Sequence, residues 1–129
     1  MTETAGPAPG YQDKPEHFVN FEPSPKRIRV SFGGETIVDT ANALILYERG
    51  HVPVYYLPRE DAAMDLLTRT EHSTHCPFKG DASYFTVNAG GKTAENAVWS
   101  YELPFDEAAG IKDYLAFYWN KMDAWHEED

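Results

Sequence analysis

The sequence predicts a mainly β fold, an antiparallel two-sheet arrangement or partly open barrel with one or two short helices. Three observations favour it. Aromatic side chains, which pack well on pleated strands, make up 14% of the 129 residues. Several short runs alternate between apolar and polar residues, as half-buried strands do. The pairs Gly33-Gly34 and Gly90-Gly91 are typical of tight hairpins, so neighbouring strands should run antiparallel.

The chain divides at about residue 25. Residues 1–25 are rich in Pro, Gly and charge and predict an extended N-terminal arm that docks through Phe18, Val19 and Phe21. Residues 26–129 predict a single β-rich domain, since a chain of this length falls near the common size of one domain.

The first half of the domain predicts four strands, at residues 26–32, 35–39, 43–48 and 52–57. In the first of them Ile28, Val30 and Phe32 alternate with polar residues, which indicates one buried face. Pro53 lacks a backbone N–H, so the fourth strand should begin there or lie at a sheet edge.

The second half predicts a short helix over residues 59–67 and a helical turn over 107–109. Four further strands are expected, at residues 68–76, 82–87, 97–101 and 111–119. Trp125 is expected to pin the C-terminal tail to the body of the domain.

Charge and cysteine content exclude several classes of function. The net charge is −10, and residues 100–129 hold eight acidic against two basic residues, so a nucleic-acid partner is not expected. No apolar run is long enough for a membrane helix, and the N-terminus lacks a signal peptide, so we expect a cytoplasmic protein. Cys76 is the single cysteine, which excludes an internal disulfide and a cysteine-rich zinc site. No cofactor is expected, and a homo-oligomer is left open.

Five segments that occur in order carry a family resemblance: Pro-Val-Tyr-Tyr at 53–56, Cys-Pro-Phe-Lys-Gly at 76–80, and the segments 96–101, 111–119 and 123–125. With them the chain resembles a bacterial family known as domain of unknown function 427, from about residue 26 to the end. The resemblance implies a fold rather than an activity. That fold is the small β-tent of methionine-R-sulfoxide reductases and related zinc-binding proteins.

The family is sometimes labelled nucleotidyltransferase-like, and the residues of this chain do not support that label. There is no glycine-rich phosphate loop followed by Lys and Ser or Thr. There is also no close pair of aspartates of the type that holds a catalytic metal. Asp61 and Asp65 lie four residues apart, which is better explained by a solvated helix face.

Cys76 is the candidate catalytic residue, with His72 or His75 as its base. A thiolate is the reactive form of cysteine, and nearby cations lower the pKa of a thiol. The alternative is that Cys76 packs as a small apolar side chain at a strand end. His72 and His75 would face opposite sides of a strand, so no metal site is predicted.

A ligand site is predicted from two cations at turns, Arg49 and Lys79, and from Tyr84, Trp99 and Tyr101, which could line a cleft. The alternative is ordinary surface charge and an aromatic core. The best hypothesis is a β domain that binds a small molecule or an anion in an aromatic-lined cleft. Two others stay open: an enzyme that uses Cys76, and a protein-interaction module that uses the edge near Pro53 or the acidic tail.

Overall fold

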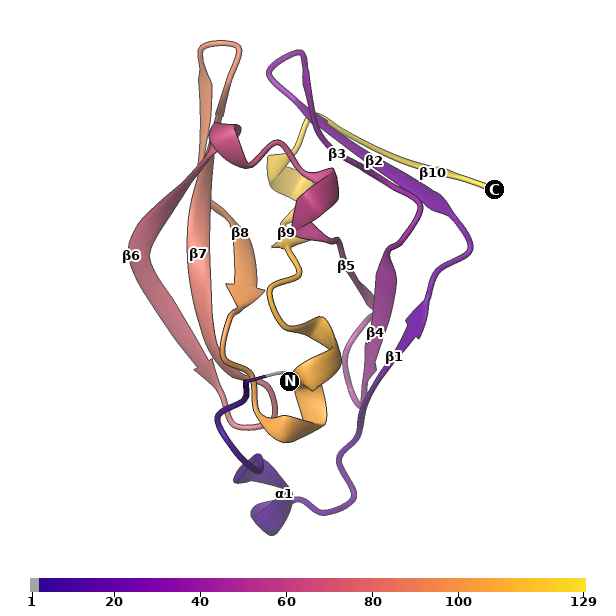
Figure 1. Ribbon diagram of the computed structural model, residues 1–129, viewed down its shortest axis with the longest axis vertical. Coiled ribbons are helices and arrows are strands. Elements are labelled where there is room, and N and C mark those ends of the chain that lie inside the picture. Colours follow the sequence, from indigo (N-terminus) through magenta and orange to yellow (C-terminus); the bar gives the residue numbers. More distant parts are fainter. Residues whose placement is uncertain (1–2) are drawn as a thin grey trace.

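The computed structural model describes residues 3–129 and arranges their strands in three antiparallel sheets (Figure 1). The β4 sheet contains β1 (Val19–Pro23), β4 (Leu44–Glu48) and β5 (Val54–Tyr56), in the order β1-β4-β5. The β2 sheet contains β10 (Ala124–Glu128), β2 (Arg27–Phe32) and β3 (Glu35–Thr40), in the order β10-β2-β3. The β7 sheet contains β6 (Leu67–Cys76), β7 (Gly80–Ala89), β8 (Lys92–Tyr101) and β9 (Ala116–Phe117), in that order.

The mainly β, antiparallel prediction is confirmed. The β7 sheet forms one wall of the molecule, and the β2 and β4 sheets together form the other (Figure 1). A backbone bridge between Leu57 and Leu115 ties the end of β5 to the segment before β9, with N–H···O distances of 2.8 and 2.7 Å. Within residues 3–129 the strands do not close into a barrel.

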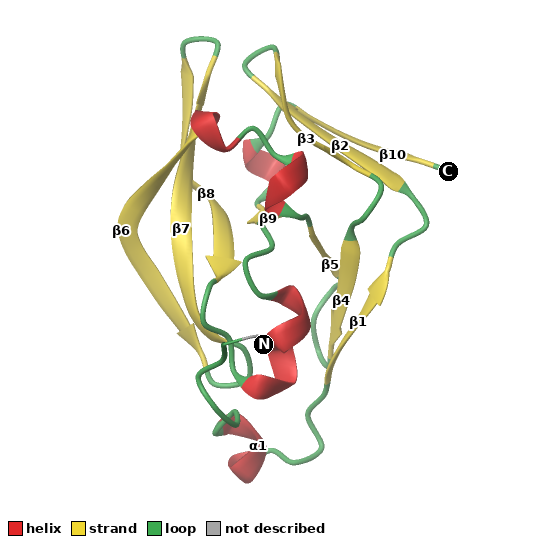
Figure 2. Ribbon diagram, in the orientation of Figure 1, coloured by secondary structure: helices red, strands yellow, loops and turns green. Residues whose placement is uncertain are grey.

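Helical turns, red in Figure 2, connect the strands; most lie between the walls, and the one labelled α1 lies below them. They are one α-helical turn and four short 3₁₀ turns: α1 (Gly10–Asp13), η1 (Arg59–Asp61), η2 (Met64–Leu66), η3 (Asp106–Ile111) and η4 (Trp119–Lys121). None of the helices among the described residues is long and apolar enough to cross a membrane.

The two faces of the β7 sheet bury different cores. Phe85 and Val98 are register partners and join the main core, which lies against Ile28, Val30 and Val38 of the β2 sheet. Tyr84 and Trp99, one position along each strand, are also partners and pack with the cluster that includes residues of the β4 sheet. Because successive side chains of a strand point to opposite faces, the β7 sheet contributes to both cores.

Two predicted elements take a different form. The strand expected over 111–119 is wrong except for β9. Leu115, Ala116 and Phe117 are buried one after another, which breaks the alternation of a strand with one buried face, and Asp113 turns the chain with φ 67°. The helix expected over 59–67 is replaced by η1 and η2. Between them Ala63 donates its N–H to the carbonyl of Ile37 at 2.8 Å, so the backbone pairs with β3 and leaves the helical path.

The two ends of the chain both pack on the domain. The residues expected to form an arm contain α1 and β1, and Gly10 donates its N–H to the carbonyl of Pro77 at 3.0 Å. β1 pairs with β4 inside the β4 sheet, while the division of the chain at residue 25 stays a prediction. At the other end β10 pairs with β2, and Trp125 stacks on Trp119 with ring centroids 4.3 Å apart.

The walls meet where the β2–β3 and β7–β8 hairpin tips lie side by side, at the top of Figure 2. A Cβ atom on Gly33 would lie 2.0 Å from the carbonyl oxygen of Ala89, and one on Gly90 would lie 1.9 Å from that of Gly33. Asp123 reinforces the contact, since its carboxylate accepts the Gly33 N–H at 2.8 Å and a hydrogen bond from Lys92 at 2.6 Å. Only glycine permits this backbone approach.

We predict that Gly33→Ala lowers the free energy of unfolding by about 2 kcal/mol more than Gly34→Ala does. Both glycines have positive φ, so both substitutions strain the backbone, but a Cβ at Gly34 meets no atom within 4 Å. Urea denaturation of the two variants measures the difference. Equal losses would show that the contact between the tips contributes nothing to stability.

Candidate functional site

The walls enclose a hollow of about 320 Å³ between the β7 sheet and the β4 sheet, which we call the inner hollow. Its aromatic lining consists of Tyr56, Tyr84, Trp99, Tyr101 and Tyr118. The rest of its lining consists of Leu46, Glu48, His51, Val52, Val54 and Lys79. A hollow of this volume falls at the lower end of the range for small-molecule sites.

Strand alternation aims these side chains into the hollow. Tyr84 on β7 is the register partner of Trp99 on β8, and Tyr101 follows Trp99 by two residues on the same face. On the opposite wall Leu46 is the register partner of Val54, and Glu48 lies two residues after Leu46. The inner hollow is therefore built on paired strands that face each other.

A buried ion pair lies at one side of the inner hollow. The Lys79 ammonium donates to Oε1 of Glu48 at 2.7 Å, and the two side chains are only 13% and 6% exposed. His17 lies with Nε2 3.0 Å from Oε2 of the same carboxylate. The pair thus joins β4, the β6–β7 turn and the N-terminal segment at one carboxylate.

Two effects oppose each other on the Glu48 carboxyl. Burial raises its pKa, while the hydrogen bonds from Lys79 and His17 lower it. The hydrogen bonds prevail, and the pKa of Glu48 lies below its ordinary value. The carboxylate is therefore charged at neutral pH and holds the ammonium of Lys79 in place.

Two phenol groups deep in the inner hollow, those of Tyr56 and Tyr101, stay protonated. Burial raises the pKa of Tyr56 and of Tyr101 well above the usual value of a phenol. Trp99 donates its indole N–H to the Tyr56 hydroxyl at 3.2 Å, and the rings meet edge to face. The Lys79 ammonium lies 5.8 Å from the centroid of the Tyr101 ring. The wall thus presents neutral hydroxyls beside one cation.

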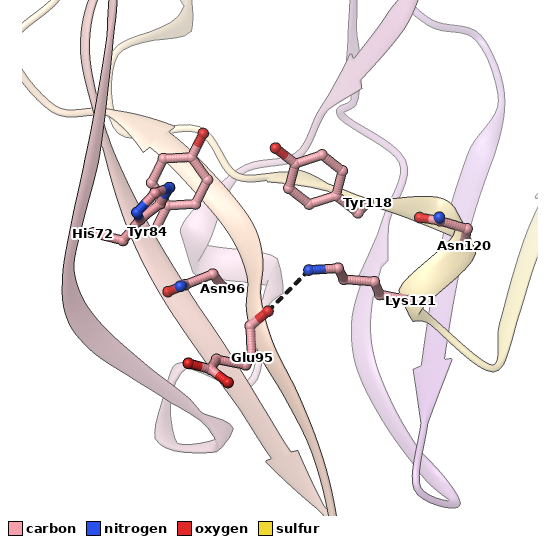
Figure 3. Close-up of a pocket in the computed structure, with 7 residues that line it drawn as sticks. All are labelled: His72, Tyr84, Glu95, Asn96, Tyr118, Asn120 and Lys121. Atoms are coloured by element: carbon pink, nitrogen blue, oxygen red, sulfur yellow. Dashed lines mark hydrogen bonds between the residues drawn. The ribbon is translucent and has the colours of Figure 1, made fainter.

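A second hollow of about 550 Å³, the outer hollow, adjoins the first. It is lined by His72, Tyr84, Glu95, Asn96, Tyr118, Asn120 and Lys121 (Figure 3). Tyr84 and Tyr118 line both hollows, and Figure 3 shows their rings facing one another across a gap. Burial and the neighbouring Tyr84 hydroxyl raise the pKa of Tyr118. The site is thus one cleft with an aromatic and a polar compartment.

The structure brings together four of the five residues predicted to bind a ligand, namely Lys79, Tyr84, Trp99 and Tyr101. Arg49 does not join them: its side chain is exposed and donates to the backbone carbonyl of Glu16 at 3.1 Å. It follows Glu48 in the chain, and Glu48 is the side chain that enters the hollow. The sequence offered one signal for Glu48, an acidic residue two positions after Leu46 on the apolar face of a strand.

The predicted catalytic group is not assembled. His75 points away from Cys76 and lies 2.7 Å from the Asp81 carboxylate. His72 is on the same side of β6 as Cys76 but four residues away, about 13 Å along an extended strand. Cys76 packs against the cluster around Tyr101 and has no hydrogen bond to a histidine in the part of the chain that the structure describes. A catalytic role for Cys76 stays a prediction without an adjacent base.

No three His, Cys, Asp or Glu side chains gather as a metal site among residues 3–129. The catalytic aspartate pair that a nucleotidyltransferase would need has no counterpart in the cleft, whose carboxylates are Glu48 and Glu95.

The family resemblance is confirmed by comparison. The model of the family described as a domain of unknown function (DUF427) matches residues 20–128, so the chain belongs to this family. No curated protein matches the chain. The family match begins inside β1 and ends at the last residue of β10, and thus covers all three sheets and the cleft.

We predict that Glu48→Gln lowers the free energy of unfolding by about 3 kcal/mol, because it leaves the Lys79 ammonium buried without a counter-charge. Asp39→Asn is the matched control: it removes a solvent-accessible carboxylate that pairs with Arg27 and Arg29, and it should lower the free energy of unfolding much less. Chemical denaturation at neutral pH compares the two. Similar losses would mean that the Glu48–Lys79 pair behaves as a surface ion pair.

The same variant predicts a pH dependence. Because the folded state lowers the pKa of Glu48, its contribution to stability is fully present above the ordinary Glu pKa of about 4.3. It is lost as the pH falls through the lower, folded value. The difference in unfolding free energy between the wild type and Glu48→Gln should therefore shrink on acidification from about pH 6 to pH 3. A difference that stays constant or grows would contradict the assignment.

Proposed function

We propose that this member of the DUF427 family is a small-molecule-binding protein whose ligand occupies the inner hollow. The ligand has a planar ring and at least one hydrogen-bond acceptor, a carbonyl or carboxylate oxygen. The ring lies among Trp99, Tyr84 and Tyr118, and the acceptor meets the ammonium of Lys79. This proposal deepens the expectation of an aromatic-lined binding cleft.

The observation that carries the proposal is a buried ammonium that opens onto a hollow. Protein interiors are close-packed, and voids larger than a water molecule are few. A charge taken out of water lowers stability unless it is paired. A domain built for stability alone would fill this space with apolar side chains, so the Glu48–Lys79 pair beside 320 Å³ of space supports binding.

Lys79 has hydrogen-bonding capacity to spare. A lysine ammonium carries three N–H donors, and Glu48 accepts one of them. No other acceptor for Lys79 lies within hydrogen-bond distance among the described residues. Because Glu48 balances the charge of Lys79, the ligand does not have to be an anion, and an uncharged carbonyl suits the site as well as a carboxylate.

The aromatic walls suit a planar ring. Trp99 is held by its hydrogen bond to Tyr56, and the Tyr84 hydroxyl lies 3.0 Å from that of Thr74. Rings held in this way lose little freedom when a ligand stacks on them, which favours affinity. A binding role for a small molecule also agrees with the net negative charge of the chain, which disfavours nucleic acids.

Single-ring probes test the proposal. We predict that benzoate, nicotinate or nicotinamide binds with a Kd on the order of 1 mM and shifts the indole N–H signal of Trp99 in an NMR titration. The signal is assigned with Trp99→Phe. Trp125 packs against the main core and serves as the internal control. If no probe moves the Trp99 signal, or if all three tryptophan signals move alike, the proposal fails.

A double variant tests the role of Lys79. Glu48→Gln combined with Lys79→Met removes both charges together, which avoids an unpaired buried charge. We expect it to weaken the binding of benzoate about tenfold, the effect of losing one hydrogen bond to a charged group. Lys26→Met, at an exposed lysine, is the control and should bind as the wild type does. Unchanged affinity in the double variant would remove Lys79 from the site.

A further inference from the structure

The geometry points to a saccharide subsite in the outer hollow. We propose that the natural ligand is a glycoside, with its planar ring in the inner hollow and its sugar in the outer one. The inference rests on the proposed function, because the ring must bind where Trp99 lies. It adds the chemical class of the ligand and assigns a role to the residues of Figure 3.

The outer hollow offers donors and acceptors that the protein itself leaves unused. Asn96 Oδ1 accepts from Thr70 at 2.6 Å, which leaves the amide NH₂ of Asn96 without a protein partner in residues 3–129. Lys121 donates to the backbone carbonyl of Glu95 at 3.1 Å and keeps further N–H groups (Figure 3). Across the described chain, the Glu95 carboxylate and the Asn120 amide form no hydrogen bond within the protein. Donors and acceptors thus surround one space.

This mixed set matches hydroxyl groups better than other ligand groups. A hydroxyl both donates and accepts, so a ring of hydroxyls can pair with amides, a carboxylate and an ammonium together. A phosphate would meet one free cation, Lys121, and would be repelled by Glu95. A metal ion would find one carboxylate, too few for a site. Since Glu95 and Lys121 balance in charge, an uncharged polyol is favoured.

The tyrosines give the outer hollow an apolar wall. A sugar ring has a face of C–H bonds, which packs on an aromatic face while its hydroxyls point to the rim. Tyr84 is only 6% exposed and is held by Thr74, with the His72 ring edge-on at 4.4 Å. Tyr118 stands opposite Tyr84 (Figure 3) and is 39% exposed. A buried ring on one side and an accessible ring on the other suit a sugar that enters from solvent.

A bulge in the β7–β8 ladder positions the polar rim. The register shifts between Phe85 and Val87, so that Glu95 and Asn96 lie in an irregular stretch of β8. Asn96 has φ 50°, and its N–H donates to the hydroxyl of Thr86 at 3.1 Å. Bulges reorient side chains and are frequent beside active sites. Here the bulge directs the side chain of Asn96 toward the outer hollow. In a regular strand this residue would have continued the pairing of β8 with β7.

Because Tyr84 and Tyr118 line both hollows, a single ligand can occupy both compartments. Linking two weakly bound parts raises affinity without new contacts, since the second part then binds intramolecularly. An aryl glycoside and a nucleoside share this chemistry, a sugar joined to a planar ring. The two differ in the size of the sugar and in the nitrogen atoms of the ring, so they form separate arms of one experiment.

The experiment compares 4-carboxyphenyl β-D-glucopyranoside with 4-hydroxybenzoate and inosine with hypoxanthine, by NMR titration of the whole chain. At least one glycoside should bind tenfold or more tightly than its own ring and should shift the side-chain amide signals of Asn96 and Asn120. Asn96→Gly removes the amide while glycine still accepts φ 50°, and it should abolish the gain in affinity that the sugar gives. Glu95→Ala, at an exposed position, should abolish the same gain. Glu71→Ala, on an exposed part of β6, is the control and should retain the gain.

The outcomes separate the two proposals. If 4-hydroxybenzoate or hypoxanthine shifts Trp99 but neither glycoside binds more tightly, the saccharide subsite is wrong and the inner-hollow function stands. If Asn96→Gly and Glu95→Ala both keep the gain, the sugar binds elsewhere and the subsite is likewise wrong. If methyl β-D-glucopyranoside shifts the amides of Asn96 and Asn120 while no ring compound shifts Trp99, the outer hollow binds a sugar alone, and both the inner-hollow function and the glycoside proposal are overturned.

Discussion

The buried ion pair between Glu48 and Lys79 connects the parts of the molecule that form the cleft. Its carboxylate lies at the end of β4, its ammonium lies in the turn between β6 and β7, and His17 brings the N-terminal segment to the same carboxylate. A pair this poorly exposed contributes little net stability compared with apolar packing, yet it strongly penalises the loss of either partner. It therefore fixes the positions of three segments relative to one another more than it stabilises the fold.

The cleft exists because the two walls of the molecule contact each other at a few separated points and leave space between those points. At one end the glycine tips of two hairpins touch, with Asp123 bridging them. Farther along, the backbone of Leu57 pairs with that of Leu115, and at the other end lies the ion pair. Near the hairpin tips the apolar side chains of the main core fill the space. Near the ion pair the tyrosines and Trp99 line the walls without filling it, and a preformed cleft of fixed shape results.

The two compartments of the cleft differ in the chemistry they offer. The inner hollow combines ring faces with one buried cation whose charge is already balanced. The outer hollow combines the same two tyrosines with two amides, a carboxylate and an ammonium. Because Tyr84 and Tyr118 belong to both, the occupants of the compartments would contact the same rings. An amphipathic ligand, with a planar part and a hydroxyl-rich part, meets the requirements of both compartments at once.

The sequence by itself determined the local structure and the type of side chain that lines the site. Alternation at Ile28, Val30 and Phe32 and the glycine pairs depend on neighbours in the chain, so they predicted strands and hairpins that the structure confirms. Tertiary structure alone decided the rest. Residues 111–119 contribute one short strand. Which of their side chains are buried depends on how the sheets pack together, and this produces no regular pattern in the sequence. Arg49 was predicted beside Lys79 in the ligand site, but Glu48 occupies that place, because the pairing of β4 with β1 and β5 sets which face of β4 looks into the cleft and Glu48 shares that face with Leu46.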